Sequence, residues 1–393
     1  MDNTDQTPTL RRRLIAGCTW LLLAFIQSAL AEFQPEPVGK IETLPAAYPD
    51  HWVMVHDFSF FHMMEGEVLV VDPLAENQAS QYKGMMTASF IAAYQRARER
   101  NEHYVIETFY SRGTRGGERT DVVTIYAPDT LAVSGEVVIP SKRITGMPKQ
   151  IATGLINGER FLGVYNFTPA QSVSIVDLEN RQFVGEVTTA GCAFVLPNGV
   201  RSFTSICANG TFLTSHLNAD GTLKDASRSA VAFDANNDPI FEGAAISGGV
   251  AYFPTFTGQV LPVDISRDEI AVEDKWWLTT TDERNWRPGG MNVATVDAAG
   301  AGYFLMNPDG GEGTHKDGGA EVWVYDLDQG ERTARITLTN WGLSLGTTGT
   351  GDGRLLLVTN AEMGVDVYRL PGGEFVQTLD TGAATPFMVH GAN

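Results

Sequence analysis

Short apolar stretches with a period of two dominate the chain, and this pattern favours β-strands over helices. Residues 122–137, VVTIYAPDTLAVSGEV, alternate, meet Ala-Pro-Asp and alternate again, as two strands joined by a tight turn do. Residues 89–102, SFIAAYQRARERNE, have the Arg and Glu content of a helix, but an apolar run follows at once. We therefore interpret this segment as strand, polar turn and strand.

The same unit, a strand that ends near an Asp, a turn and a second short strand, returns along the chain. Its spacing is close to the period of about 40 to 50 residues that propeller blades show. Further strand patterns between the copies supply the remaining strands of each blade. The sequence therefore predicts an all-β fold, a seven-bladed β-propeller in one domain over residues 50–393, with a two-domain sandwich as the structural alternative. The seven copies start at Val68, Val122, Val173, Phe212, Val260, Val322 and Val365.

The first residues have the regions of a secretory signal peptide. Three arginines, 11–13, precede an apolar run, and Ala29-Leu30-Ala31 supplies the small residues of a cleavage site. The run is too short for a permanent membrane span, which needs about 20 apolar residues. We expect residues 1–31 to be removed on export. The Pro- and Glu-rich residues 32–49 then form an extended N-terminal arm.

Composition and charge narrow the function classes. The chain has 393 residues and is 43% apolar, which is ample for a buried core. Lys and Arg number 28 against 47 Asp and Glu, a net charge of −19. This balance argues against an electrostatic role on nucleic acid or on an anionic membrane.

Two cysteines remain once the signal peptide is gone, Cys192 and Cys207. In an exported chain this spacing favours a disulfide across neighbouring strands of one sheet. The alternative is a pair of buried free thiols.

No catalytic or metal-binding set emerges from the sequence. The seven histidines lack the spacing of metal ligands. The run Gly342-Leu-Ser344-Leu-Gly346 matches the hydrolase elbow, but no helix pattern follows it. We therefore predict no catalytic residue, no metal and no cofactor in this chain.

Charged and aromatic loop segments are the features left unexplained. Trp and Arg beside rigid turns are typical interface anchors. The alternative is an internal salt-bridge network between blades. As candidates for a protein–protein interface we select Arg112, Arg115, Arg119, Asp121, Trp286, Arg287 and His315.

Several strings resemble the heavy subunits of the methylamine and aromatic amine dehydrogenases, and more closely the aromatic amine branch. The resemblance extends over nearly the whole mature chain, and the Cys192/Cys207 spacing is similar to that of the family's heavy-chain disulfide. The strings are GMMTASF at Gly84, TFYSRGTRGGERTDVV at Thr108, FTPAQSVSIVDLE at Phe167, NWRPGG at Asn285 and NPDGGEGTHK at Asn307.

The resemblance implies a seven-bladed propeller in the periplasm that pairs with a small light subunit in an α2β2 assembly. In that family the light subunit carries tryptophan tryptophylquinone and the catalytic carboxylate. The complex oxidises a primary amine to an aldehyde, releases ammonia and passes electrons to a blue copper protein such as azurin or amicyanin. This chain would be the scaffold.

Phe90, within GMMTASF, matches the aromatic residue that the family's heavy chain lends to the substrate channel. The segment after it, IAAYQRARERNEHY, is more basic and less Gly-rich than the family pattern, which bears on the shape of the channel mouth. From the fold alone, the alternative function is a stand-alone periplasmic propeller that binds a ligand, or a lactonase-type hydrolase.

Overall fold

The computed structural model of the chain describes residues 43–114, 116–146 and 149–392. The predicted signal peptide, residues 1–31, and residues 32–42 of the predicted arm lie outside the described residues, so both stay predictions. Residues 43–49 form no strand, and the Leu44 N–H donates to the Asp129 carbonyl at 2.7 Å. Residues from Leu44 onward form one compact unit.

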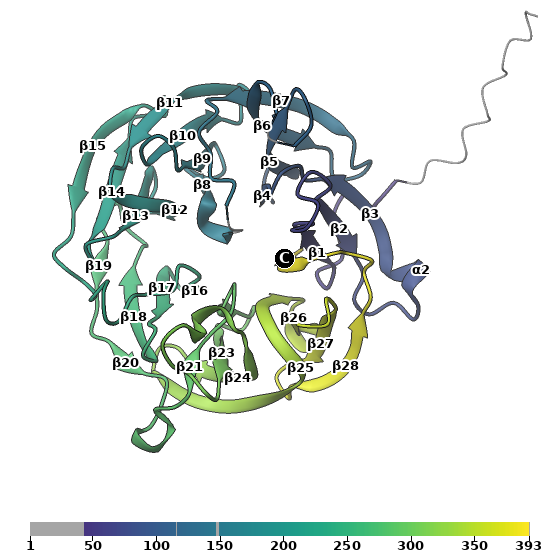
Figure 1. Cartoon of the computed structure of the whole chain (residues 1–393), viewed down its shortest axis with the longest axis vertical. Helices are drawn as coiled ribbons and strands as arrows, with labels where there is room; N and C mark the ends of the chain where they lie inside the picture. The colour runs from purple at the N-terminus through teal and green to yellow at the C-terminus, as the bar shows by residue number, and fades with distance from the viewer. Residues whose placement is uncertain (1–42, 115, 147–148, 393) are drawn as a thin grey trace, which may run out of the picture. The chain divides into compact units, whose positions relative to one another are not determined.

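Five antiparallel sheets of four or five strands follow one another around a central axis (Figure 1). In the first, the last strand of the chain pairs with the first: β29 (Pro386–Gly391), β1 (Val53–Asp57), β2 (Glu67–Val71) and β3 (Tyr82–Thr87). The second contains β4 (Ala93–Ala97), β5 (Glu102–Tyr110), β6 (Arg119–Tyr126) and β7 (Val133–Ile139). The third contains β8 (Thr153–Ile156), β9 (Phe161–Asn166), β10 (Ser172–Asp177) and β11 (Gln182–Thr188). The fourth contains β12 (Cys192–Asn198), β13 (Ser202–Cys207), β14 (Phe212–Leu217) and β15 (Leu223–Arg228), and the fifth β16 (Ala245–Ser247), β17 (Val250–Pro254), β18 (Gln259–Asp264), β19 (Ala271–Val272) and β20 (Trp276–Trp277).

The remaining strands form one eight-stranded sheet, because the long strand β25 (Glu331–Thr348) pairs on both of its sides. Up to Thr337 it pairs with β24 along most of that strand, and from Gly342, which also lies opposite Gly319 of β24, it pairs with β26. The other members are β21 (Arg287–Pro288), β22 (Ala294–Val296), β23 (Ala301–Asn307), β24 (Gly319–Asp326), β26 (Leu355–Asn360), β27 (Val365–Arg369) and β28 (Glu374–Leu379).

Between Thr337 and Gly342, β25 passes from the first half of this sheet to the second. Gly342 lies opposite Asn360 of β26, which marks the start of the second half. The first half contains β22 to β24, and the second contains β26 to β28. A hydrophobic cluster that includes Leu305 and Leu356 fills the space between the two halves.

The all-β propeller prediction is confirmed. Each of the seven predicted copies begins in a strand, namely β2, β6, β10, β14, β18, β24 or β27, and each pairs with the strand that follows it. Residues 89–102 also follow the prediction, since β4 and β5 flank a turn. The separate sheets in the described part of the chain number six and not seven, because β25 joins two sets of strands.

The sequence of the inner strands explains the core. β1 reads VMVHD and is buried along its whole length, because neighbouring sheets cover both of its faces. Outer strands such as β7 alternate between exposed and buried positions. The Asp57 carboxylate strengthens the closure of the ring, since it accepts from the N–H groups of Ala384 and Thr385 at 2.7 and 2.8 Å.

The helices among the described residues are short. They are α2 (Gln78–Gln81) and the 3-10 turns η1 (Gln150–Ala152), η2 (Thr281–Glu283), η3 (Thr314–Lys316) and η4 (Gly351–Gly353). Within residues 43–392, leaving aside the gaps, no helix has the length and apolar character that a membrane span requires.

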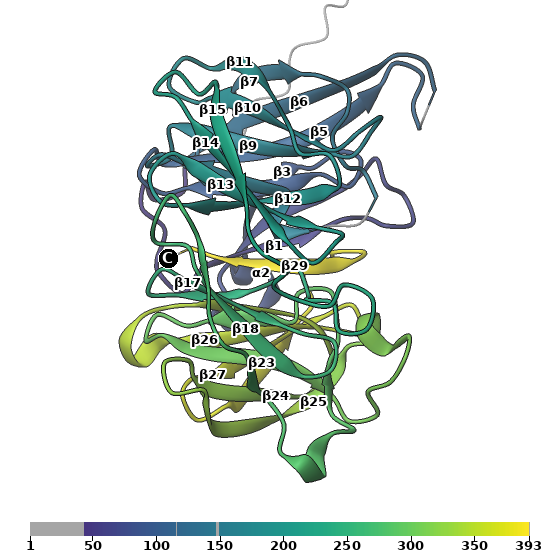
Figure 2. The ribbon, with the colours of Figure 1, turned by 90° about the vertical axis from the view of Figure 1, so that its left-hand side faces the viewer.

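Because the strands alternate in direction, the connections lie at two opposite faces of the ring. We call one the Phe90 face; it carries the connections 58–66, 88–92, 111–118 and 308–318. The opposite face carries the turns 98–101, 297–300 and 349–354. Figure 2 shows the loop between β5 and β6 extending on the side away from the C-terminal end of β29.

Candidate functional site

Phe90 lies in the turn between β3 and β4. Phe90 and Ile91 both have left-handed backbone conformations, with φ of 55° and 49°, which a bulky or β-branched residue seldom adopts. The Phe90 side chain is only 1% exposed, and its ring meets the edge of Tyr110 with 5.5 Å between centroids. The surrounding structure must therefore hold this turn in place.

Arg143 holds the turn. Its Nη2 donates to the Phe90 carbonyl at 2.8 Å, and its Nη1 donates to the carbonyls of Ile91 and Ile144 at 3.0 and 2.9 Å. The residue is 3% exposed, and burial lowers the pKa of its guanidinium to about 10. The group stays charged at neutral pH, and it fixes the turn through charge-assisted hydrogen bonds.

Asp121 lies behind Arg143 and is fully buried. Its carboxylate accepts two hydrogen bonds of 2.8 Å from the Arg119 guanidinium and one of 3.0 Å from the Arg143 N–H. The Thr108 hydroxyl donates to the same carboxylate at 2.8 Å. These contacts are those of an internal network that joins neighbouring sheets, and the assignment of Arg119 and Asp121 to a subunit interface stays a prediction.

Glu107 is a second buried carboxylate near this turn. It accepts from the Ser89 N–H at 2.8 Å and from the Thr124 hydroxyl at 2.5 Å. Burial raises its pKa above the ordinary value. The hydrogen bond to Ser89 ties it to the residue directly before Phe90 in the chain.

The rest of the charged stretch forms the exposed loop between β5 and β6. The Arg112 side chain is exposed, and its N–H donates to the Gly116 carbonyl at 2.9 Å. The Thr114 hydroxyl lies 2.7 Å from the sulfur of Met64, so this loop contacts the connection 58–66. Arg115, another predicted interface residue, lies outside the described residues.

The other predicted interface residues separate into two groups. Trp286 packs inward, with its ring 5.4 Å from that of Trp323. Arg287 and His315 both contact Phe256, with the guanidinium 4.8 Å and the imidazole 6.5 Å from its ring centroid. Arg287 and His315 therefore share Phe256 as a neighbour, whereas Trp286 anchors its loop to the core.

Two neighbouring cavities connect these residues across the Phe90 face. One, of about 540 Å³, is lined by Arg119, Arg143 and Lys316 among others. The second, of about 790 Å³, is lined by Phe256 and His315. Glu242 lines both. The structure thus brings Phe90, Arg119 and His315 to one face, although they are far apart in sequence.

Large apolar side chains are exposed on the same face. Phe61 is 77% exposed, and Phe167, at the edge of the smaller of these two cavities, is 53% exposed. Phe60 and Met64 lie near Phe61 in the connection 58–66. Exposed aromatic residues around cavities are typical of protein–protein interfaces.

Comparison with known proteins identifies the family. Residues 50–389 match the sequence profile of the methylamine dehydrogenase heavy chain (MADH) family. The chain belongs to this family. The heavy chain of Methylophilus methylotrophus methylamine dehydrogenase is 24% identical over 376 residues, which cover 92% of this chain and 91% of that protein. The corresponding heavy chain of Methylorubrum extorquens is 24% identical over 287 residues, 72% of this chain and 69% of that one.

Solved structures of other proteins have a fold similar to that of this chain. The periplasmic gluconolactonase of Pseudomonas aeruginosa aligns with a TM-score of 0.58 over 87% of this chain and 99% of its own, at 15% identity. At this identity the likeness shows a shared architecture and no shared activity. In the described part of this heavy-chain family member, no group of three or more His, Cys, Asp or Glu side chains is placed to hold a metal ion.

Two features around Phe90 are not evident from the sequence. Arg143 lies in the segment SKRITG, and no motif or regular spacing of residues there indicates a role for it. The basic segment after Phe90, predicted to bear on the channel mouth, contains β4, which runs away from Phe90, so Arg96 and Arg98 line a cavity that opens at the opposite face. The alternating direction of strands could have indicated this, because each strand carries the chain across the ring.

Proposed function

We propose that this chain is the non-catalytic heavy subunit of a periplasmic quinoprotein amine dehydrogenase. The family membership over residues 50–389 is the observation that carries this proposal. The light subunit supplies tryptophan tryptophylquinone, which accepts electrons from the amine. The complex converts a primary amine to an aldehyde and ammonia, and a blue copper protein takes the electrons. The assembly is an α2β2 heterotetramer.

The Phe90 face is the docking surface for the light subunit in this proposal. Its exposed aromatic residues, Phe61 and Phe167, supply apolar area whose burial against a partner would favour association. The cavities beside Arg119 and His315 offer depressions for side chains of the partner. The alternative is that the charged residues of this face form only an internal network. That alternative accounts for Asp121, but it does not explain the exposed aromatic residues.

Phe90 takes the position of the aromatic residue that lines the substrate channel at the subunit junction. The turn clamped by Arg143 would hold it in one conformation, and because its side chain is 1% exposed in this chain alone, we propose that it supports the channel wall from within the heavy subunit. The strings that resemble the family are closer to those of the aromatic amine branch. We therefore propose aromatic primary amines as the preferred substrates.

We also count the ring as seven blades. In support, β25 pairs with β24 along most of Glu331 to Thr337 and with β26 from Gly342, and Gly342, which also lies opposite Gly319 of β24, is the point where the two sets of strands meet. The hydrophobic cluster around Leu305 and Leu356 lies between these sets, as other clusters lie between separate sheets.

Coexpression with the light-subunit gene from the same source tests the docking surface. Phe61→Ser should reduce the amount of light subunit that copurifies and the amine-dependent reduction of an artificial electron acceptor in parallel. Val200→Ser, at a 64% exposed position on the opposite face, is the matched control and should change neither. Equal copurification for both variants would remove Phe61 from the interface, and no amine-dependent reduction by the native complex would refute the function.

A further inference from the structure

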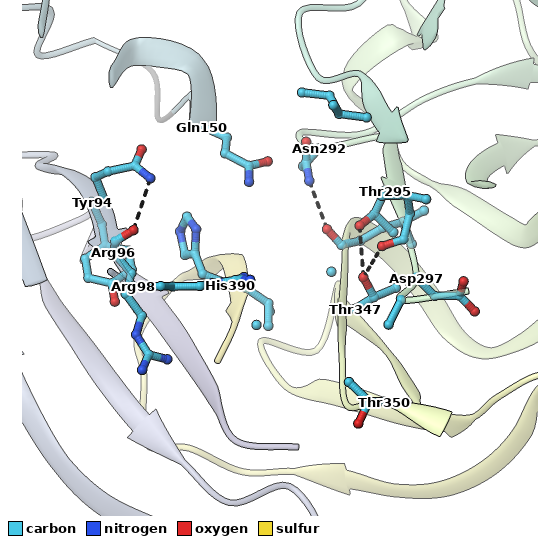
Figure 3. A pocket seen from close by; sticks show the side chains of 18 residues that line it. Tyr94, Arg96, Arg98, Gln150, Asn292, Thr295, Asp297, Thr347, Thr350 and His390 are labelled. Carbon is cyan, nitrogen blue, oxygen red and sulfur yellow. Dashed lines mark hydrogen bonds between the residues drawn. The ribbon is translucent and has the colours of Figure 1, made fainter. Parts of the chain in front are cut away.

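A cavity of about 630 Å³ lies on the axis of the ring and opens at the face opposite Phe90. Its walls come from the innermost strands, among them β4, β22, β25 and β29. Figure 3 shows Tyr94, Arg96, Arg98, Gln150 and His390 on one side and Asn292, Thr295, Asp297, Thr347 and Thr350 on the other. The proposed docking surface leaves this cavity unused.

One side of the cavity is rich in hydrogen-bond donors. Arg96 and Arg98 are two positions apart, at the end of β4 and just after it, so both side chains extend from the same side of the chain. Arg96 donates one hydrogen bond, of 2.7 Å, to the Ala392 carbonyl, and its guanidinium stacks 4.7 Å from the centre of the Tyr48 ring. This stacking orients the guanidinium, and its other N–H groups have no hydrogen-bond partner among the described residues.

Arg98 and His390 have unused polar groups. With the residues that the structure describes, the Arg98 guanidinium forms neither an ion pair nor a hydrogen bond, although its backbone N–H donates to Glu159 at 2.7 Å. The Nε2 atom of His390 is buried and also lacks a hydrogen-bond partner among them. Burial, and then the charge of Arg96, lowers the pKa of Arg98, whereas the Glu159 carboxylate acts in the opposite direction.

The other side of the cavity does not neutralise these charges. Asp297 is the only carboxylate among the described residues of the lining. It accepts a hydrogen bond of 2.9 Å from the Tyr303 hydroxyl and pairs with Arg354 at 2.5 Å. The Thr347 hydroxyl donates to the Val296 carbonyl at 2.5 Å. The cavity is therefore positively charged within a chain whose net charge is −19.

From this arrangement we infer that the axial cavity binds a small anion that carries a carboxylate or phosphate group, with Arg96 and Arg98 as its principal ligands. Guanidinium groups bind the oxygens of both anions with two parallel hydrogen bonds. Gln150 and His390 face the same space and can contribute further polar contacts. The inference stands independently of the amine dehydrogenase function, because it rests on the opposite face of this chain.

Titration calorimetry and thermal unfolding of the purified native protein test the inference, with inorganic phosphate and citrate as separate probes. Sodium chloride at equal ionic strength controls for screening. Saturable binding of phosphate identifies a phosphate site and binding of citrate a carboxylate site. Either probe should also raise the melting temperature as its concentration exceeds the Kd.

Arg98→Gln should lower the affinity at least tenfold, and because the guanidinium forms no hydrogen bond or ion pair with the described residues, this variant should fold normally. Arg201→Gln, at another exposed arginine of the same face outside the cavity, should bind like the native protein. The inference is overturned if neither probe binds saturably, or if Arg98→Gln binds with unchanged affinity.

Discussion

The guanidinium of Arg143 donates a hydrogen bond of 2.8 Å to the carbonyl oxygen of Phe90, across 53 positions of sequence. A buried charge thus fixes the backbone of a turn whose residues have left-handed conformations. Asp121 supports the arrangement from behind by accepting from the Arg143 N–H at 3.0 Å. The position of Phe90 therefore depends on a residue far along the chain.

Arg143→Met should lower the free energy of unfolding by about 3 kcal/mol, because several buried carbonyl groups lose their donor and Asp121 loses a neighbouring charge. Urea unfolding followed by tryptophan fluorescence measures the change. Arg112→Met, at an exposed position on the same face, serves as the control and should stay within about 0.5 kcal/mol of the native protein. Equal stability of the two variants would show that Arg143 does not hold the turn.

Phe90→Ala should change the relative kcat/KM for aromatic and aliphatic amines without dissociating the light subunit. It should also lower stability by about 3 kcal/mol, since the side chain is buried. Phe161→Ala, at a fully buried position in β9, is the matched control for that loss. If both variants leave the amine preference unchanged, Phe90 does not line the channel.

The architecture was largely predictable, whereas the site was not. Alternation in residues 122–137 marks β6 and β7, and in β7 it arises because one side of this outer strand faces water. The recurring pairs of strands predict the ring because each pair must bury its apolar side against a neighbour. Arg143 contacts Phe90 through backbone carbonyls, and such contacts leave no pattern in the sequence. The sharing of β25 between two sets of strands likewise follows from tertiary structure.

Glu283 should contribute to stability above its unfolded pKa and lose that contribution in acid. The Arg332 guanidinium donates hydrogen bonds to the Glu283 carboxylate, one of them at 2.9 Å. These bonds lower the pKa of Glu283 to about 2, against an ordinary value of 4.5. The unfolded chain therefore binds more protons between these values, and stability falls as the pH decreases from 4.5 towards 2. Glu283→Gln should reduce the slope of unfolding free energy against pH in this window; an unchanged slope would contradict the assignment.

Buried histidines should make the protein less stable in mild acid. Burial, and then the charge of Arg96, lowers the pKa of His103 to about 3 from an ordinary value of 6.5. Burial lowers the pKa of His390 to about 4. Between pH 6.5 and 4 the unfolded chain binds more protons, so the unfolding free energy rises with pH by up to about 1.4 kcal/mol per unit for each such histidine.

His103→Gln tests this pH dependence, because the amide can still form hydrogen bonds with the Tyr94 hydroxyl. The variant should show a shallower pH dependence of unfolding free energy than the native protein. His62→Gln, at a site whose side chain is 65% exposed, should leave the slope unchanged. Identical slopes for native protein and His103→Gln would show that His103 is not a buried neutral group.

The disulfide between Cys192 and Cys207 confirms the sequence prediction, and it joins opposite residues of β12 and β13. Thiol labelling of the unfolded, non-reduced mature protein should therefore detect no free cysteine. Replacing both cysteines by serine should lower the free energy of unfolding by about 3 kcal/mol, from the loop of 15 positions that the bond closes. Stoichiometric labelling would contradict the bond in the mature protein.

Native mass spectrometry of the protein purified from its own source tests the central claim most directly. A heavy subunit should appear in an α2β2 assembly with a small partner, and the partner should show the visible absorbance of a quinone that is bleached by an amine. A protein that is found alone, with no quinone-bearing partner, would contradict the proposed role.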